Sequence, residues 1–262
     1  MSKEEFSCVR DNLTIRGYVY RDENLNKPIV ILSHGFMGTH KMCIDYAEYF
    51  CKKGYAAFIY DFNGGGIGSK SDGSVSDMTV LTEAEDLKAV INFASAQPYV
   101  NKDDITLVGL SQGGFVSGIV AAKFQDKIKR LIMFYPALCI PDDARKGSMI
   151  FAKFDPENVP EIVKCGPMKL GRCFVTAVNK LNANDEISGY KGPVLIIHGT
   201  KDRIVNIEYS KKAKEAYLEK RKDDPEAKEV RSLYIEGANH GFMGLKKKKW
   251  NAAAFSEIDR FL

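Results

Sequence analysis

A Gly-x-Ser-x-Gly pentapeptide, Gly109–Gly113, constrains the fold of this chain more than any other stretch of its sequence. The apolar run Ile105–Val108 precedes it directly and a segment with the pattern of a helix follows it, so Ser111 stands at a strand-to-helix junction. Such a junction is the setting of a nucleophile elbow, a sharp and strained turn that presents a serine hydroxyl at the end of a sheet. Side chains two residues before or after the serine would collide with the neighbouring strand or helix, which explains both glycines.

Strand-like runs alternate with helix-like runs along most of the chain, and this alternation is typical of a mostly parallel sheet. The predicted strands are Phe6–Arg10, Leu13–Tyr20, Pro28–Ser33, Tyr55–Tyr60, Ile105–Gly109, Arg130–Tyr135, Val194–His198 and Glu229–Ile235. The predicted helices are Lys41–Lys52, Leu81–Ala96, Gln112–Lys123, Met168–Lys180, Asn206–Lys220 and Trp250–Leu262. We therefore expect an α/β fold with an eight-stranded sheet, helices on both faces and a single domain over residues 1–262.

The regular alternation lapses between Pro136 and Tyr190, where turns prevail and only one good helical stretch is found. We interpret residues 137–187 as a small cap insertion over the carboxyl edge of the sheet. Open α/β sheets bind their ligands at that edge, so the insertion is expected to cover the serine.

Nucleophilic serine chemistry requires a base and a group that orients the base. His240 lies in the small-residue loop Gly237–Phe242, just past a predicted strand, where an imidazole can reach back towards Ser111. Asp202 follows the strand that ends at His198 and can accept the imidazole N–H. The chain order Ser111, Asp202, His240 is that of α/β-hydrolases.

A developing oxyanion requires two N–H donors that are already in place. The amide of Gln112, directly after the nucleophile, is one expected donor, and the amide of Phe36, between two glycines in a loop after a strand, is the other. Of the remaining histidines, His34 is expected to brace this loop by hydrogen bonds, His198 to be a satisfied near-core residue, and His40 to be exposed.

Over essentially its whole length the chain resembles α/β-hydrolase serine esterases, and more narrowly the bacterial feruloyl (cinnamoyl) esterases. The resemblance is carried by the motifs His34–Gly38, Asp61–Ser69, Gly109–Gly114, His198–Asp202 and Asn239–Phe242. It implies a hydrolase of hydroxycinnamoyl esters with a small cap that lines the acyl pocket.

Two departures from that family bear on the substrate. The family's Asn-Gly-His-Gly loop is replaced here by Asn63–Gly66. Asp143 matches the cap aspartate that would bind a phenol hydroxyl, although an exposed loop acid is the alternative interpretation. Phe174 stands where the family has a tyrosine, so it contributes no hydroxyl, and a pocket with fewer polar partners selects less strongly for a phenol.

Composition excludes several other classes of protein. The 38 Lys and Arg residues are interspersed with 34 Asp and Glu residues, and the net charge of +4 gives no footprint for nucleic acid. The charged N-terminus has no signal-like apolar region and no apolar run could span a membrane, so a cytoplasmic protein is expected. The 6 cysteines include no Cys-x-x-Cys pair, and serine chemistry requires neither a metal nor a cofactor.

Several functions share this constellation of residues. A short- or medium-chain acyl esterase, a monoacylglycerol-type lipase and an acyltransferase on the same triad all remain open. A catalytically silent binding protein is disfavoured by the intact Ser111, Asp202 and His240. The expected partner is a small-molecule ester, and the sequence leaves a homodimer open.

Overall fold

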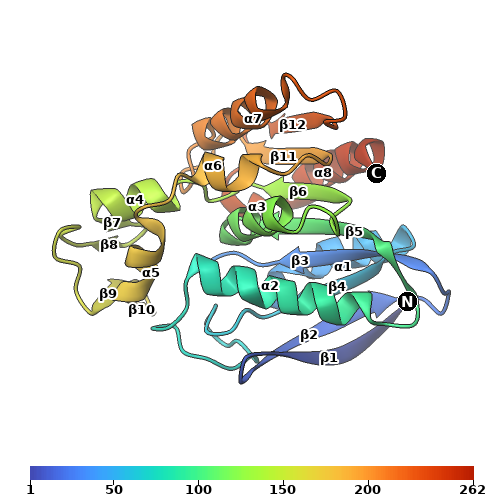
Figure 1. Ribbon diagram of the computed structural model, residues 1–262, viewed down its shortest axis with the longest axis horizontal. Coiled ribbons are helices and arrows are strands. Elements are labelled where there is room, and N and C mark those ends of the chain that lie inside the picture. The colour runs from blue at the N-terminus through green and yellow to red at the C-terminus, as the bar shows by residue number, and fades with distance from the viewer.

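An eight-stranded sheet forms the centre of the computed structural model, which describes residues 1–262 (Figure 1). Its strands are β1 Ser2–Arg10, β2 Leu13–Arg21, β3 Lys27–Ser33, β4 Ala56–Tyr60, β5 Val100–Leu110, β6 Arg130–Phe134, β11 Val194–Gly199 and β12 Val230–Ile235. They lie in the order β1-β2-β4-β3-β5-β6-β11-β12. β2 alone runs in the opposite direction to the other strands, so the predicted mostly parallel sheet is confirmed.

Different helices cover the two faces of this sheet. α1 Ile44–Lys52 and α8 Lys247–Phe261 pack on one face, whereas α2 Val80–Ser95, α3 Gln112–Lys123 and α7 Glu208–Arg221 pack on the other. None of the helices combines the length and the apolar composition needed to cross a membrane.

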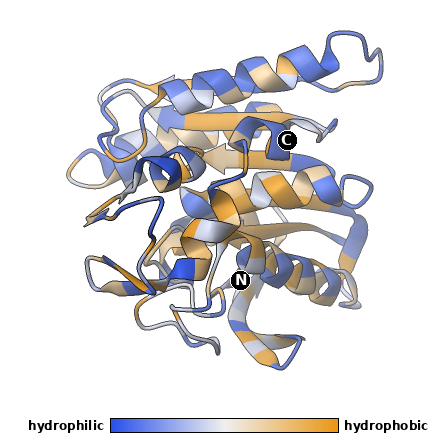
Figure 2. Ribbon diagram, turned by 60° about the vertical axis from the view of Figure 1, so that its left-hand side comes forward, coloured by the Kyte–Doolittle hydropathy of each residue, from blue (hydrophilic) through white to orange (hydrophobic).

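Strand β3 illustrates why both faces are apolar. Ile29 and Ile31 belong to the core beneath α2 and α3, while Val30 and Leu32 belong to the core beneath α1 and α8. Successive side chains of a strand point to opposite faces, so a strand covered on both sides is a continuous apolar run. Burial of each such side chain contributes about 1.5–3 kcal/mol. Figure 2 shows the inner strands in the hydrophobic colours.

The chain between β6 and β11 leaves the sheet and forms a group of small elements beside the main body (Figure 1). These elements are α4 Ile140–Lys146, β7 Ser148–Met149, β8 Ala152–Lys153, β9 Ile162–Cys165, β10 Met168–Gly171 and α5 Arg172–Val178. The next helix, α6 Ala183–Ser188, instead lies against α3. A Cβ atom at Gly118 of α3 would lie 2.7 Å from Ile187, so this end of the segment is packed into the main body.

The helix predicted for Met168–Lys180 is wrong in its first part. Met168–Gly171 is strand β10, which pairs antiparallel with β9, and the helix begins only at Arg172. Gly166 adopts a φ of 60° in the turn between the two strands, a conformation that glycine reaches without strain. The hairpin then buries Met168 and Leu170, an alternation with a period of two that fits a strand.

We expect Gly109→Ala to destabilise the fold by about 1–3 kcal/mol, the usual cost of overpacking. The added methyl group would lie 2.2 Å from the carbonyl oxygen of Gly113, which is backbone and cannot move aside. Urea unfolding measures the change. Gly189→Ala is the control, because the nearest atom to its methyl group lies 3.8 Å away. Equal stability of the two variants would contradict this account of the turn.

Candidate active site

Ser111 occupies a strained turn between β5 and α3. Its φ of 54° and ψ of −117° lie outside the regions that ordinary side chains favour. A Cβ atom at Gly113 would lie 2.4 Å from the carbonyl oxygens of both Ser33 and His34, so only glycine fits there. The amide of Ser111 donates to the carbonyl of Phe134, 2.9 Å away, which fixes the turn to the neighbouring strand.

The loops after three parallel strands bring together the three residues that the sequence singled out. The Nε2 atom of His240 lies 3.0 Å from Oγ of Ser111. The Nδ1 atom of the same ring lies 2.7 Å from Oδ2 of Asp202. The carboxyl ends of parallel strands meet at one edge of a sheet, which is why residues separated by 129 positions along the chain become neighbours.

The carboxylate of Asp202 is fully buried yet remains ionised. Burial alone would raise its pKa, but hydrogen bonds from His198 and His240 hold the pKa well below its ordinary value. The amides of Ile204 and Val205 donate to Oδ1 at 2.8 and 2.9 Å. Asp202 therefore presents a negative charge to His240 across the pH range in which an imidazole titrates.

The backbone amides of Phe36 and Gln112 lie close to Ser111 and donate to no other group of the protein. Gln112 is the first residue of α3, so its N–H lies at the positive end of the helix. Gly35 brings the other amide close, because a Cβ atom there would lie 3.0 Å from Cβ of Ser111. Both amides that the sequence analysis named therefore remain available as hydrogen-bond donors beside Ser111.

His34 ties the loop that carries Phe36 to the loop after β4. Its Nε2 atom accepts from the amide of Phe62 at 3.1 Å, and Nδ1 lies 2.8 Å from the carbonyl oxygen of Gly35. The ring is therefore neutral, with its proton on Nδ1, and burial lowers its pKa. This hydrogen-bonded brace is the role that the sequence suggested for His34.

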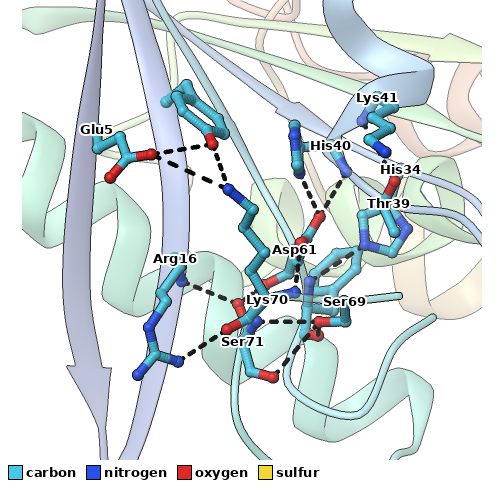
Figure 3. A network of polar contacts seen from close by, with 12 residues as sticks. Glu5, Arg16, His34, Thr39, His40, Lys41, Asp61, Ser69, Lys70 and Ser71 are labelled. Atoms are coloured by element: carbon cyan, nitrogen blue, oxygen red, sulfur yellow. Dashed lines mark hydrogen bonds and ion pairs between the residues drawn. The ribbon is translucent and has the colours of Figure 1, made fainter. Parts of the chain in front are cut away.

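The prediction that His40 is exposed is wrong. His40 is buried, and both its backbone amide and its Nδ1 atom contact Oδ1 of Asp61, at 2.6 and 2.8 Å (Figure 3). The other carboxylate oxygen accepts from the amide of Lys70. Burial alone would raise the pKa of Asp61, but these hydrogen bonds lower it. No sequence motif marks His40, because its partner lies 21 positions away on another loop.

A cavity of about 270 Å³ opens beside Ser111, and most of its lining is apolar. Phe36 and Gln112 border it on the side of the sheet. Asp143 of α4 and Phe174 of α5 border it from the segment outside the sheet, so both substrate-binding candidates lie next to the serine. Burial raises the pKa of Asp143.

Two contacts of buried groups at the site have no signal in the sequence. Glu83 accepts a hydrogen bond from the side chain of Gln112 at 2.8 Å, and burial raises its pKa well above the ordinary value. His198, expected only to be satisfied near the core, contacts Asp202 directly at 3.1 Å. Glu83 lies in the first turn of α2, a helix that Thr79 and Thr82 cap at its N-terminus.

This sheet order, with a serine in the turn that follows β5, defines an α/β-hydrolase. The chain belongs to the dienelactone hydrolase family, whose model matches residues 15–259. Among solved structures, Est1E from Butyrivibrio proteoclasticus with ferulic acid bound has a TM-score of 0.84 and 28% identity, over 97% of this chain and 98% of that one. DcsB in complex with a substrate analogue has a TM-score of 0.77 and 23% identity over the full length of both chains. At that identity DcsB supports the fold alone.

Curated relatives match only part of the chain. Polyketide transferase grgF of Penicillium sp is 30% identical over 138 residues, which is 52% of this chain and 45% of that protein. An uncharacterized 31.7 kDa protein of the traX-finO intergenic region of Escherichia coli is 31% identical over 127 residues, 48% of this chain and 43% of its own. The matched segments therefore span less than half the length of these relatives.

We expect His34 to make the stability of the fold sensitive to mild acid. Its pKa in the folded state lies below the unfolded value of about 6.5, so its contribution is complete above that pH and is lost as the pH falls through the folded-state pKa. Between about pH 7.5 and 5.5, the parent should lose more unfolding free energy than His34→Gln, whose amide oxygen can accept from Phe62 without titrating. Glu83, whose pKa is raised, makes the fold more stable as the pH falls. It is present in both proteins, so its effect on the unfolding free energy cancels in the comparison. Parallel stability curves would contradict the assignment.

Proposed function

We propose that this chain is a serine carboxylic-ester hydrolase in which Ser111 is the nucleophile, His240 the general base and Asp202 the residue that orients it. The observation that carries the proposal is the continuous line of hydrogen bonds from Oγ of Ser111 through the imidazole to the buried carboxylate. Membership of the dienelactone hydrolase family and the likeness to Est1E support ester cleavage.

In the proposed mechanism, Oγ of Ser111 attacks the ester carbonyl carbon while Nε2 of His240 takes the hydroxyl proton. The carbonyl electron pair moves to its oxygen, which accepts hydrogen bonds from the amides of Phe36 and Gln112. As the tetrahedral intermediate collapses, His240 gives its proton to the leaving alcohol oxygen, and an acyl-serine remains.

Water then attacks the acyl-serine in the same geometry. His240 takes a proton from this water and returns one to Oγ of Ser111, so the carboxylic acid leaves and the enzyme is restored. Every proton in both half-reactions is carried by these side chains and the substrate, and the mechanism requires no cofactor.

We infer that the acyl group is aromatic, of the hydroxycinnamoyl type, and that residues 137–187 act as a cap over it. The rings of Phe36 and Phe174 lie 6.3 Å apart at the cavity and offer apolar surface to a planar acyl group. Ligand pockets commonly span about 300–1,000 Å³, so a cavity at the small end of that range suits a single ring. Ferulic acid bound to Est1E is consistent with this substrate class.

Asp143 is the group that would distinguish a phenolic acyl group from a plain one. Its half-buried carboxyl forms no ion pair and lies in a mostly apolar lining that also includes Ser148 and Arg203. A phenol hydroxyl that reached it would donate a hydrogen bond to it. Because Phe174 has no hydroxyl, Asp143 would act without the second polar partner that a tyrosine would supply.

Acyl transfer is the second candidate, favoured by the relative named as a polyketide transferase. In that reaction an alcohol or thiol replaces water in the second half of the mechanism. Product ratios in the presence of an added alcohol or thiol separate the two functions, because a transferase yields the new ester or thioester where a hydrolase yields the free acid.

We expect Ser111→Ala to abolish hydrolysis of nitrophenyl esters and methyl ferulate without unfolding the protein. Loss of a triad member costs at least about 10³-fold in kcat, and alanine fits the same turn. Initial rates of the purified variant, with circular dichroism as the control for folding, make the test. A variant that keeps activity within about tenfold of the parent would show that Ser111 is not the nucleophile.

We expect Asp143→Ala to lower kcat/KM for methyl ferulate by about 1–3 kcal/mol, the cost of an unmet buried polar group, and to leave nitrophenyl butyrate almost unchanged. Asp142→Ala is the matched control, since Asp142 lies on the same helix outside the cavity. Equal losses on both substrates in Asp143→Ala would mean that the carboxyl only supports the cap.

A further inference from the structure

Two histidines, and not one, donate to the same oxygen of Asp202. Nδ1 of His240 lies 2.7 Å from Oδ2, and Nε2 of His198 lies 3.1 Å from that atom. The carboxylate is fully buried, and its other oxygen is already occupied by the amides of Ile204 and Val205. The strength with which Oδ2 holds His240 therefore depends on the second donor as well.

The surroundings of His198 fix its proton on Nε2. This nitrogen faces Oδ2 of Asp202 and, also at 3.1 Å, the carbonyl oxygen of Val205, and both of these atoms only accept. On the other side of the ring, Nδ1 lies 2.7 Å from the hydroxyl of Ser210 on α7, which can donate to it. No part of the ring is exposed to solvent and none of it lines the cavity, so His198 cannot touch the substrate.

We propose that His198 is a positioning residue: its Nε2–H holds the Asp202 carboxylate in place and takes up part of the negative charge that would otherwise fall on His240. The inference rests on the proposed function, in which His240 must be neutral to act as a base. A hydrogen bond shared by two donors is weaker to each of them, so the second histidine keeps His240 from binding its proton too tightly.

Two variants of His198 separate the donor from the bulk of the side chain. His198→Met removes the N–H at similar volume, while His198→Gln keeps an N–H on a side chain of similar reach. Ser210→Ala is the control, because it removes the other partner of the ring without touching Asp202. Other titratable or charged groups remain unchanged in these variants. Tyr135 lies with its ring 4.8 Å from that of His240. Burial raises the pKa of Cys139, and the charge of nearby Asp202 raises it further. Asp143 and Arg203 line the cavity beside Ser111.

The readout is the rate at which a fluorophosphonate probe labels Ser111, measured against pH, together with the melting temperature of each variant. In His198→Met we expect labelling at the pH optimum to fall at least about tenfold, the fold-change for loss of one hydrogen bond to a charged group. In the plot of labelling rate against pH, the midpoint on the acid side should move to higher pH, because Oδ2 of Asp202 then binds the protonated imidazole of His240 more strongly. His198→Gln should keep the parental midpoint, and so should Ser210→Ala even where its melting temperature falls.

The proposal would be overturned if folded His198→Met were labelled at the same rate as the parent and with the same pH midpoint. If His198→Met fails to fold, His198→Gln decides: a parental melting temperature with a displaced midpoint would show that the donor is not what matters. Failure of the proposed function gives a different result, since the parent itself would then not be labelled at Ser111 and would behave like Ser111→Ala.

Discussion

The turn that holds Ser111 leaves no room for a side chain on either side of it, and the rest of the site is arranged around that constraint. Methyl groups at Gly109 or Gly113 would overlap backbone atoms, which do not yield. A side chain held in such a conformation costs about 1–3 kcal/mol and persists only where its surroundings impose it. The surroundings of Ser111 impose this conformation, because β6 binds its amide and Gly35, in the loop after β3, lies against its side chain. The serine is thus presented by a rigid sheet edge.

Burial and charge oppose each other at Asp202, and the hydrogen bonds decide the outcome. An unpaired buried carboxylate would take up a proton, because desolvation disfavours its charged form. Four donors surround this one, two of them ring N–H groups and two of them amides, and the balance lies on the ionised side. Glu83 is also fully buried but accepts only one hydrogen bond, from the side-chain amide of Gln112. Burial therefore has the larger effect there, and the pKa of Glu83 is raised. The number of donors therefore distinguishes a buried carboxyl whose pKa is lowered from one whose pKa is raised.

The sheet and the candidate triad could be predicted from the sequence because their signals are local. Continuous apolar runs such as Pro28–Ser33 mark strands buried on both faces, and small residues mark the turns after them. The pairing of His40 with Asp61 has no local signal, since it depends on two loops that meet only in the folded chain. The helix predicted at Met168–Gly171 is wrong for a related reason. A run of four residues fits either a helix or a strand, and pairing with Ile162–Cys165 makes it a strand.

The division between sheet edge and outlying segment explains why motifs indicate the chemistry more firmly than the substrate. Ser111, Asp202 and His240 follow strands that end in regular parallel pairing with their neighbours in the sheet. Asp143 and Phe174 stand on two short helices, α4 and α5, outside the sheet, where the surrounding hairpins are only a few residues long. Both side chains line the cavity, and neither belongs to the turn at Ser111. Residues that line the cavity from outside the sheet can therefore differ between relatives while Ser111, Asp202 and His240 stay in place.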